Sequence, residues 1–328
     1  MRAIPPNSLI SPSFTQNLSD LKARTEIVSQ EAVTGMYKDL TSQLRGDIGR
    51  AMTSHKALSD ISTERSILDL RSGRTDLTQN ALGRLQDYAG DLPVRMLSAK
   101  SALDQKAVDL VALDARNALS DIFSALNQRA GDRSLFSGDM TATAPLPDAE
   151  VLMTAVRTIA LTAPDLAAFE AQINTFFNAP TGGWSGTATP IYQGTITSTD
   201  PDAVTAANPA IVGVIAGLSV IALGRSSENI ALVNQNPHLL LNAASRAAGA
   251  KESLILLRGE LGTNQQRIQA AKENLDTEET LLNSLYTDIA GRDAYEAANE
   301  LKLLETSLES AYLITGRVSR LSLLNFLR

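Results

Sequence analysis

Apolar residues recur every seven positions along much of the C-terminal half of the chain. The repeating positions are Leu240, Ala247, Leu254, Leu261, Ile268, Leu275, Leu282 and Ile289. A second set lies three residues beyond some of these, at Leu257, Ala271 and Leu285, with polar Asn264 and Glu278 at other positions of that set. A heptad repeat of this length predicts a long helix in a left-handed coiled coil or helical bundle over about 226–290.

Both ends of the chain carry an amphipathic helical pattern of their own. Steps of three and four residues join Phe14, Leu18, Leu21, Thr25, Val28, Ala32 and Gly35 near the N-terminus. The same steps join Leu301, Leu304, Leu308, Ala311, Ile314, Val318, Leu321 and Leu324 near the C-terminus. Gly35 and Gly291 interrupt the helical patterns, and we interpret Gly291 as a hinge. An amphipathic terminal helix needs a partner, which is either the other end of this chain or another chain.

The pattern between the two ends predicts further helices on either side of a segment that mixes short helices and strands. Helical patterns cover about 50–67 and about 72–130, and Pro93 predicts a kink or break in the second. Gly, Ser, Thr and Pro then cluster over 131–147. Two short helices are expected at 148–161 and 165–177, and a small hairpin at 181–199. The apolar stretch 210–223 contains Gly213 and Gly217, whose spacing allows close approach to a neighbouring element.

These patterns predict a mainly α fold. Both chain ends would form a long-helix rod or coiled-coil bundle, and a small α+β domain would be inserted between the two halves. The expected domains are an N-terminal coiled-coil segment, two halves of a helical rod, an inserted variable domain and a C-terminal coiled-coil segment. The N-terminal segment covers 1–49 and the C-terminal segment 291–328. The two rod halves cover 50–140 and 226–290, and the inserted domain covers 141–225.

Composition removes several classes of function. The 328 residues contain no cysteine, which excludes disulfides, thiolate metal sites and cysteine nucleophiles. The formal net charge is −7 and no basic block occurs, which argues against a nucleic-acid-binding surface. The first residues resemble no secretory signal, and the longest apolar run, 210–223, is too short to span a bilayer.

Candidate chemistry is sparse. Nothing in the sequence pairs His55 with His238, no HxxxH motif occurs, and ordinary surface or capping roles explain both. The sequence Gly183–Thr187 approaches a nucleophile elbow around Ser185, but threonine stands where that motif requires glycine. The acidic pairs Glu278–Glu279 and Asp200/Asp202 lack the spacing of a calcium loop. We therefore expect no catalytic residues, no cofactor, no metal site and no enzymatic activity.

Three stretches together resemble the bacterial flagellin superfamily. Arg133–Gly138 (RSLFSG), followed by Asp139–Thr141 and Pro145, is similar to the family segment "LFSG…T…P". The ending Val318–Leu327 is similar to the family ending "SL…yL", and Val33–Gly35 to its "STG". The family's usual "DDP" is absent, since Lys38–Thr41 and Arg45–Asp47 stand in that region. The LFSG segment and the compact insertion resemble the hook–filament junction branch of the superfamily more than filament flagellins.

The resemblance implies a structural subunit of the bacterial flagellum. Such a protein would leave the cell through the flagellar type III export apparatus without a cleaved signal peptide, assisted by an export chaperone. It would form a ring with copies of itself, between a neighbouring hook-associated junction protein and flagellin, outside the cell. The terminal helices would then pair in the assembly. The expected contact residues are Leu18, Leu21, Val28, Leu304, Leu308, Val318, Leu321 and Leu324.

Three alternatives remain open at this stage. A flagellin, the repeating filament subunit, would share the same terminal helices. A cytoplasmic coiled-coil scaffold, or a chemosensory-like helical bundle, would share the heptads alone. An enzyme would need a role for Ser185 or His238 that no motif supports.

Overall fold

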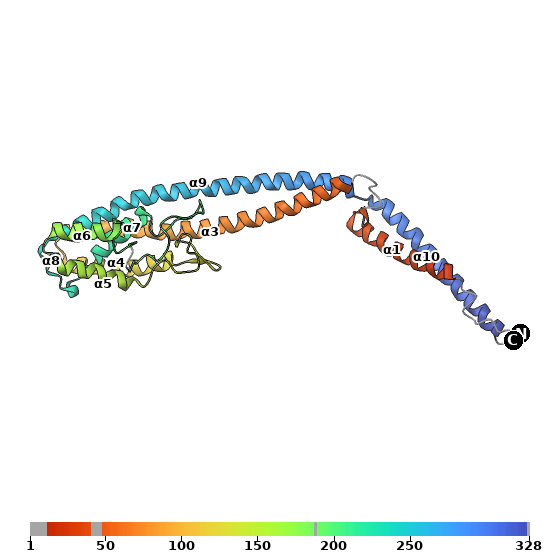
Figure 1. Cartoon of the computed structure of the whole chain (residues 1–328), viewed down its shortest axis with the longest axis horizontal. Coiled ribbons are helices and arrows are strands. Elements are labelled where there is room, and N and C mark those ends of the chain that lie inside the picture. Colours follow the sequence, from red (N-terminus) through yellow and green to blue (C-terminus); the bar gives the residue numbers. More distant parts are fainter. Residues whose placement is uncertain (1–11, 41–47, 187–188, 327–328) are drawn as a thin grey trace. The chain divides into compact units, whose positions relative to one another are not determined.

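A computed structural model describes the chain over residues 12–40, 48–186 and 189–326, with side chains over 15–40, 49–186 and 189–317. Twelve named elements follow in chain order. They are α1 (Pro12–Thr34), α3 (Ile48–Ser101), α4 (Gln105–Leu126), β1 (Arg129–Ala130), β2 (Arg133–Ser134), α5 (Ala149–Thr162), α6 (Leu166–Asn178), α7 (Pro209–Ala222), η2 (Ser226–Glu228), α8 (Ala231–Gln235), α9 (Pro237–Ala290) and α10 (Ala294–Phe326). The two strands pair antiparallel with each other. The predicted mainly α fold of long helices is confirmed (Figure 1).

The chain divides into two compact units. The terminal unit consists of Met1–Arg65 and Glu273–Arg328, and the central unit of Ser66–Lys272. Helices α3 and α9 each contribute residues to both units. In the central unit one apolar core joins α3 and α4 to residues of α5–α9. The five-part division expected from the sequence stays a prediction.

The heptad predicted in α9 is the buried stripe of that helix. Its positions from Leu240 to Leu275 are all buried, and Leu282 and Ile289 are half-buried. Helix α3 lies alongside α9 (Figure 1). It carries a heptad that the sequence reasoning missed, at Ile61, Leu68, Thr75, Leu82, Ala89 and Met96. Polar bonds cross between the two helices in the central unit, where Gln79 Nε2 donates to the Arg258 carbonyl at 2.8 Å.

Of the kink or break expected near Pro93, the break is wrong. Helix α3 continues through Pro93 to Ser101, and the chain turns at Ala102–Asp104 instead. Two local features make this turn. Leu103 adopts a left-handed conformation with φ of 54°, and the Asp104 carboxylate caps α4 by accepting from the Lys106 and Ala107 amides. Leu92 and Met96 are buried on either side of Pro93, so packing holds the helix where one backbone hydrogen bond is missing.

The hairpin expected at 181–199 is also wrong. The described residues of that stretch contain turns and no strand, while the short hairpin of the described chain is β1–β2. Backbone bonds fold the stretch back onto the end of α6, since the Trp184 amide donates to the Phe176 carbonyl at 2.9 Å. Trp184 is buried and lies against Phe123 and Phe177. The glycines therefore serve tight turns around a buried aromatic residue.

The segment Leu135–Gly138, quoted above as part of the RSLFSG motif, is a packing junction of the central unit. Phe136 is fully buried, and its carbonyl accepts from the Ala206 amide at 3.0 Å and the Tyr192 hydroxyl at 3.2 Å. Gly138 has a φ of +65°, and a Cβ there would lie 2.3 Å from Thr195 Oγ1. Only glycine fits this position without displacing the loop.

The close approach expected at Gly213 and Gly217 is confirmed. A Cβ on Gly213 would lie 2.9 Å from the Cβ of Ala250, and one on Gly217 would lie 2.6 Å from the Cβ of Ala247. Helix α7 thus packs backbone to backbone against α9 within the central unit. This contact explains why an apolar run that is buried nearly throughout carries two glycines.

Candidate assembly interface of the terminal helices

Helices α1 and α10 pack against each other in the terminal unit (Figure 1). Their direction is antiparallel, because Arg24 bonds Glu300 while Glu31, further along α1, bonds the earlier Arg292. The segments beside the two glycine breaks also meet. The Arg292 amide donates to the Gly35 carbonyl at 2.8 Å, and the Tyr37 amide donates to the Ala290 carbonyl at 3.0 Å. We call this meeting point, residues 35–37 and 290–292, the hinge.

The positions predicted for the assembly interface are buried or half-buried wherever the structure describes their side chains. Val28 is 3% exposed and Leu304 is 9% exposed, and both are thereby buried within one chain. Leu18, Leu21 and Leu308 are half-buried. The remaining predicted positions are Val318, Leu321 and Leu324, whose side chains lie outside the described residues. Their role in contacts between subunits stays a prediction.

One residue of the expected C-terminal stripe faces solvent. Ile314 is 52% exposed. The pairing of Arg24 with Glu300 explains this difference, because each step back along an antiparallel α1 matches one step forward along α10. Pro12, where the described α1 begins, therefore lies opposite about residue 312. Ile314 lies past the reach of the described part of α1.

Beside that point, α10 carries an apolar surface that the described chain leaves uncovered. Tyr312 and Leu313 are 51% and 62% exposed and directly precede Ile314, and Leu303 is 69% exposed. Leu303 and Ile314 lie on one side of α10, and Tyr312 and Leu313 lie on other sides, because successive helix residues are about 100° apart. We call these four exposed residues together the α10 apolar surface. Three consecutive exposed apolar residues are unusual on a helix without a binding role.

Four charged side chains form an ion cluster between α1 and α10 at the hinge. The Arg292 guanidinium bonds the carboxylates of both Glu31 and Glu300, and it lies over the Tyr37 ring at 5.5 Å from the centroid. The other oxygen of Glu31 accepts from the Lys38 amide at 2.8 Å. The other oxygen of Glu300 accepts from Arg24 Nη2 at 2.7 Å. We call Arg24, Glu31, Arg292 and Glu300 the hinge ion cluster.

Sequence reasoning missed the hinge ion cluster. Glu31 is the one charged residue among the buried residues of the described chain. A signal was present, because opposite charges stand close to the two glycine breaks, Glu31 before Gly35 and Arg292 after Gly291. The pattern did not reveal which charges would meet.

The ion pairs shift the pKa values of Glu300 and Arg292. Burial of Glu300 tends to raise the pKa of its carboxyl, but hydrogen bonds from Arg24 and Arg292 outweigh burial and lower that pKa below the ordinary value of 4.5. Burial of Arg292 tends to lower the pKa of its guanidinium. Hydrogen bonds to Glu300 and Glu31 outweigh that effect and raise the pKa. Both shifts favour the charged, paired forms.

We expect acid to loosen the α1–α10 pair through Glu300. A carboxyl whose pKa is lower in the folded than in the unfolded state stabilises the fold above its unfolded pKa, and that stabilisation is lost as the pH falls through the folded pKa. The loss should therefore begin near pH 4.5 and continue below it. Thermal unfolding followed by circular dichroism from pH 7 to pH 3 tests this, with Glu300→Gln showing a weaker pH dependence. An identical pH dependence in both proteins would contradict the assignment.

The residues considered for catalysis are not brought together. His55 is exposed and its ring lies 6.0 Å from that of Tyr286, and His238 is exposed at the start of α9. Ser185 belongs to the turn around Trp184. No group of three or more His, Asp or Glu among the described residues could hold a metal ion. Along the described chain, no helix combines the length and apolar character that a membrane span needs.

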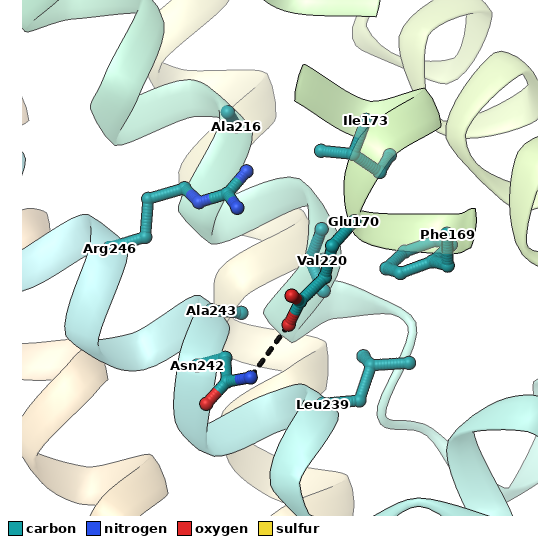
Figure 2. A pocket seen from close by; sticks show the side chains of 9 residues that line it. All are labelled: Phe169, Glu170, Ile173, Ala216, Val220, Leu239, Asn242, Ala243 and Arg246. Atoms are coloured by element: carbon teal, nitrogen blue, oxygen red, sulfur yellow. Dashed lines mark hydrogen bonds between the residues drawn. The ribbon is translucent and has the colours of Figure 1, made fainter. Parts of the chain in front are cut away.

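The central unit has an apolar crevice between α6, α7 and α9 (Figure 2). Phe169 and Ile173 of α6 and Leu239 of α9 form part of its wall. Two of its polar groups bind each other, since Asn242 Nδ2 donates to Glu170 Oε1 at 2.6 Å. We therefore interpret the crevice as a gap in the packing of the three helices. Its lining contains no pair of nucleophile and base.

The C-terminal helices resemble those of a known protein family. Residues 247–327, which run through α9 and α10, match the family model of the bacterial flagellin C-terminal helical region. No curated protein matches the chain. The matched region contains both Arg292 of the hinge and the α10 apolar surface. The match supports a relation of this chain to the bacterial flagellin superfamily.

Proposed function

We propose that the chain is an adaptor subunit that joins hook to filament, as hook-associated protein 3 does, by self-assembly of its terminal helices. The observation that carries the proposal is the α10 apolar surface. Leu303 and Tyr312–Ile314 are exposed on a helix that already contacts α1 through other apolar residues. Exposed apolar residues of this kind become buried when subunits associate.

The proposal assigns two different tasks to the two faces of α10. Leu304 and Val28 hold α1 and α10 together within one chain. Leu303 and Ile314 would then contact neighbouring copies, so that the pair acts as one building block. Leu18, Leu21 and Leu308, which are half-buried, lie at the edge between the two tasks. Under this proposal the terminal segments form the inner part of the ring.

Replacing Leu313 and Ile314 by glutamate should abolish incorporation into the flagellum while the α1–α10 pair stays folded. Two carboxylates on the α10 apolar surface would have to lose water on association, which is unfavourable by several kcal/mol. The measurement is the amount of tagged variant recovered with flagella sheared from a strain that lacks the native copy, together with circular dichroism of the purified monomer.

A matched control places the same two charges on polar positions of the same helix. Thr306 and Ser310 are exposed, and their replacement by glutamate should leave incorporation close to that of the parent. Full incorporation of the Leu313/Ile314 variant would show that this surface makes no contact between subunits.

The choice of a junction protein over a filament flagellin rests on the LFSG segment at Leu135–Gly138 and the compact 141–225 region. Location separates the two. Immunogold labelling of intact flagella should place the protein at the boundary of hook and filament, in a few copies per flagellum. Labelling along the whole filament would identify a flagellin. Retention in the cytoplasm of a flagellated cell would favour a coiled-coil scaffold.

The proposal also implies several binding partners, which the chain would meet one after another. They are copies of itself, a neighbouring hook-associated junction protein, flagellin, an export chaperone and the flagellar export apparatus. Export would precede assembly outside the cell. No catalytic step is part of this function, which agrees with the structural character of the matched family.

A further inference from the structure

The apolar contact between α1 and α10 does not by itself fix their alignment. Leu21 and Val28 are one heptad apart on α1, and Ala297 and Leu304 are one heptad apart on α10. Sliding one helix by seven residues would place similar apolar side chains opposite each other again. When apolar residues repeat every seven positions on both helices, a polar position is needed to exclude shifted alignments.

The hinge ion cluster supplies such a position. Glu31 is 5% exposed, and the Arg292 side chain is 7% exposed. Each is neutralised by the other in the observed alignment. A shift of one heptad would move Glu31 by about 10 Å along the helix axis relative to Arg292. Glu31 would then remain in a largely apolar contact without Arg292, and Arg292 would keep Glu300 alone, which is unfavourable.

We propose that Glu31 and Arg292 are positioning residues that specify the alignment of α1 with α10. A buried ion pair contributes little net stability compared with apolar residues of similar size, but it penalises every alignment in which the charges do not meet. The pair therefore selects one alignment from several that the apolar seam would tolerate. This inference concerns a single chain and holds whether or not the proposed function is correct.

The surrounding groups support this role. Glu300 on α10 bonds the second branch of the Arg292 guanidinium, and Arg24 on α1 bonds Glu300 in turn. From the segment after α1, the Lys38 amide bonds Glu31 and the Tyr37 ring lies against Arg292. Arg24 is 68% exposed, so it adds little. The charges alternate in sign along the cluster, and only one alignment satisfies them all.

A competing explanation is that the backbone bonds of the hinge set the alignment alone. The Arg292 amide with the Gly35 carbonyl, and the Tyr37 amide with the Ala290 carbonyl, also tie the two segments together. Glu31 differs from these groups because it lies within α1. It ties the helix itself, rather than the segment after it, to Arg292.

Distance measurement between two spin labels tests the proposal. The chain has no native cysteine, so cysteines at the exposed positions Ala23 and Asn299 can be labelled without background. Double electron–electron resonance on the dilute, full-length chain reports the distribution of distances between the labels. We expect one narrow peak for the labelled parent.

The decisive variant replaces both charges by apolar side chains, Glu31→Leu with Arg292→Met. We expect α1 and α10 to stay paired, with a second, separate peak, because the seam then tolerates an alignment in which Ala23 is shifted by about 10 Å along the helix axis relative to Asn299. The matched control, Lys22→Met with Glu26→Leu, removes two exposed charges of α1 and should keep the single parental peak.

Two results would overturn the proposal. A single parental peak in the Glu31/Arg292 variant would show that the hinge backbone and the seam suffice for alignment. A broad long-distance distribution with lost helical content would show that the cluster stabilises the pair rather than aligning it. Neither result bears on incorporation into flagella, which tests the α10 apolar surface separately.

Discussion

Replacing Gly217 by valine should lower the free energy of unfolding of the central unit by about 3 kcal/mol or more. A Cβ at this position would lie 2.6 Å from the Cβ of Ala247 and 2.9 Å from its Cα and amide nitrogen. Two of these contacts are with the backbone of α9, which cannot rotate away as a side chain can. Helix α7 would have to move outward, and the core between α7 and α4 would open with it.

The single tryptophan makes this measurement specific to the central unit. Trp184 is 1% exposed and belongs to the same apolar core as α7. Its fluorescence during urea denaturation therefore reports that unit alone, and the midpoint gives the change in unfolding free energy. The parent and the variant are compared at equal denaturant slope.

Gly249 provides a matched control for the same substitution. It lies in α9, close to Ala247 in sequence, and a Cβ there would have nothing within 4 Å. Valine at this position should leave the midpoint unchanged or raise it slightly, because valine favours helix over glycine by a few tenths of a kcal/mol. Equal midpoints for the Gly217 and Gly249 variants would show that α7 does not pack closely on α9.

The contrast between α9 and α3 shows how far a repeat can be read from sequence. In α9 the buried heptad positions are leucine or isoleucine except for Ala247, so the seven-residue spacing is visible in the sequence. In α3 the buried stripe passes through Thr75 and Ala89, while Leu70 and Ile67 are exposed. Helix α3 thus buries its stripe against α9 without an obvious apolar repeat, and only the partner helix identifies it.

The wrong predictions of a break at Pro93 and of a hairpin at 181–199 have a common cause. Both predictions used local preference, and tertiary packing decided otherwise. Burial of Leu92 and Met96 keeps α3 helical through Pro93. At 181–199, β-branched residues suggested strands, but the burial of Trp184 against Phe177 draws the chain into turns.

In the terminal helices, too, the sequence predicts the local pattern but not the contacts between distant residues. Their apolar stripes were predictable because helical spacing is local. The bond between Glu31 and Arg292 joins residues 261 positions apart, so no local pattern could reveal it. The division of α10 into a face toward α1 and a separate apolar surface also depends on where α1 begins, which sets the exposure of Ile314.

Replacing Leu304 by aspartate should separate α1 from α10, while the same substitution at the adjacent Leu303 should leave them paired. Leu304 is 9% exposed in the contact with α1, and Leu303 is 69% exposed. A carboxylate at the buried position must be desolvated without a partner, at a cost of about 3 kcal/mol. That cost makes the open form of the pair roughly a hundredfold more populated.

Limited trypsin digestion with mass spectrometry measures this opening. Cleavage after Lys22 and Arg24 of α1, and after Lys302 of α10, requires the helices to separate and unwind. These cuts should be much faster in the Leu304→Asp variant than in the parent, and nearly unchanged in Leu303→Asp. Equal cleavage rates for the two variants would mean that Leu304 does not hold the pair together. Combined with incorporation assays, the outcome separates the two faces of α10, because Leu303→Asp should impair assembly from an intact pair, whereas Leu304→Asp should impair it by removing the pair itself.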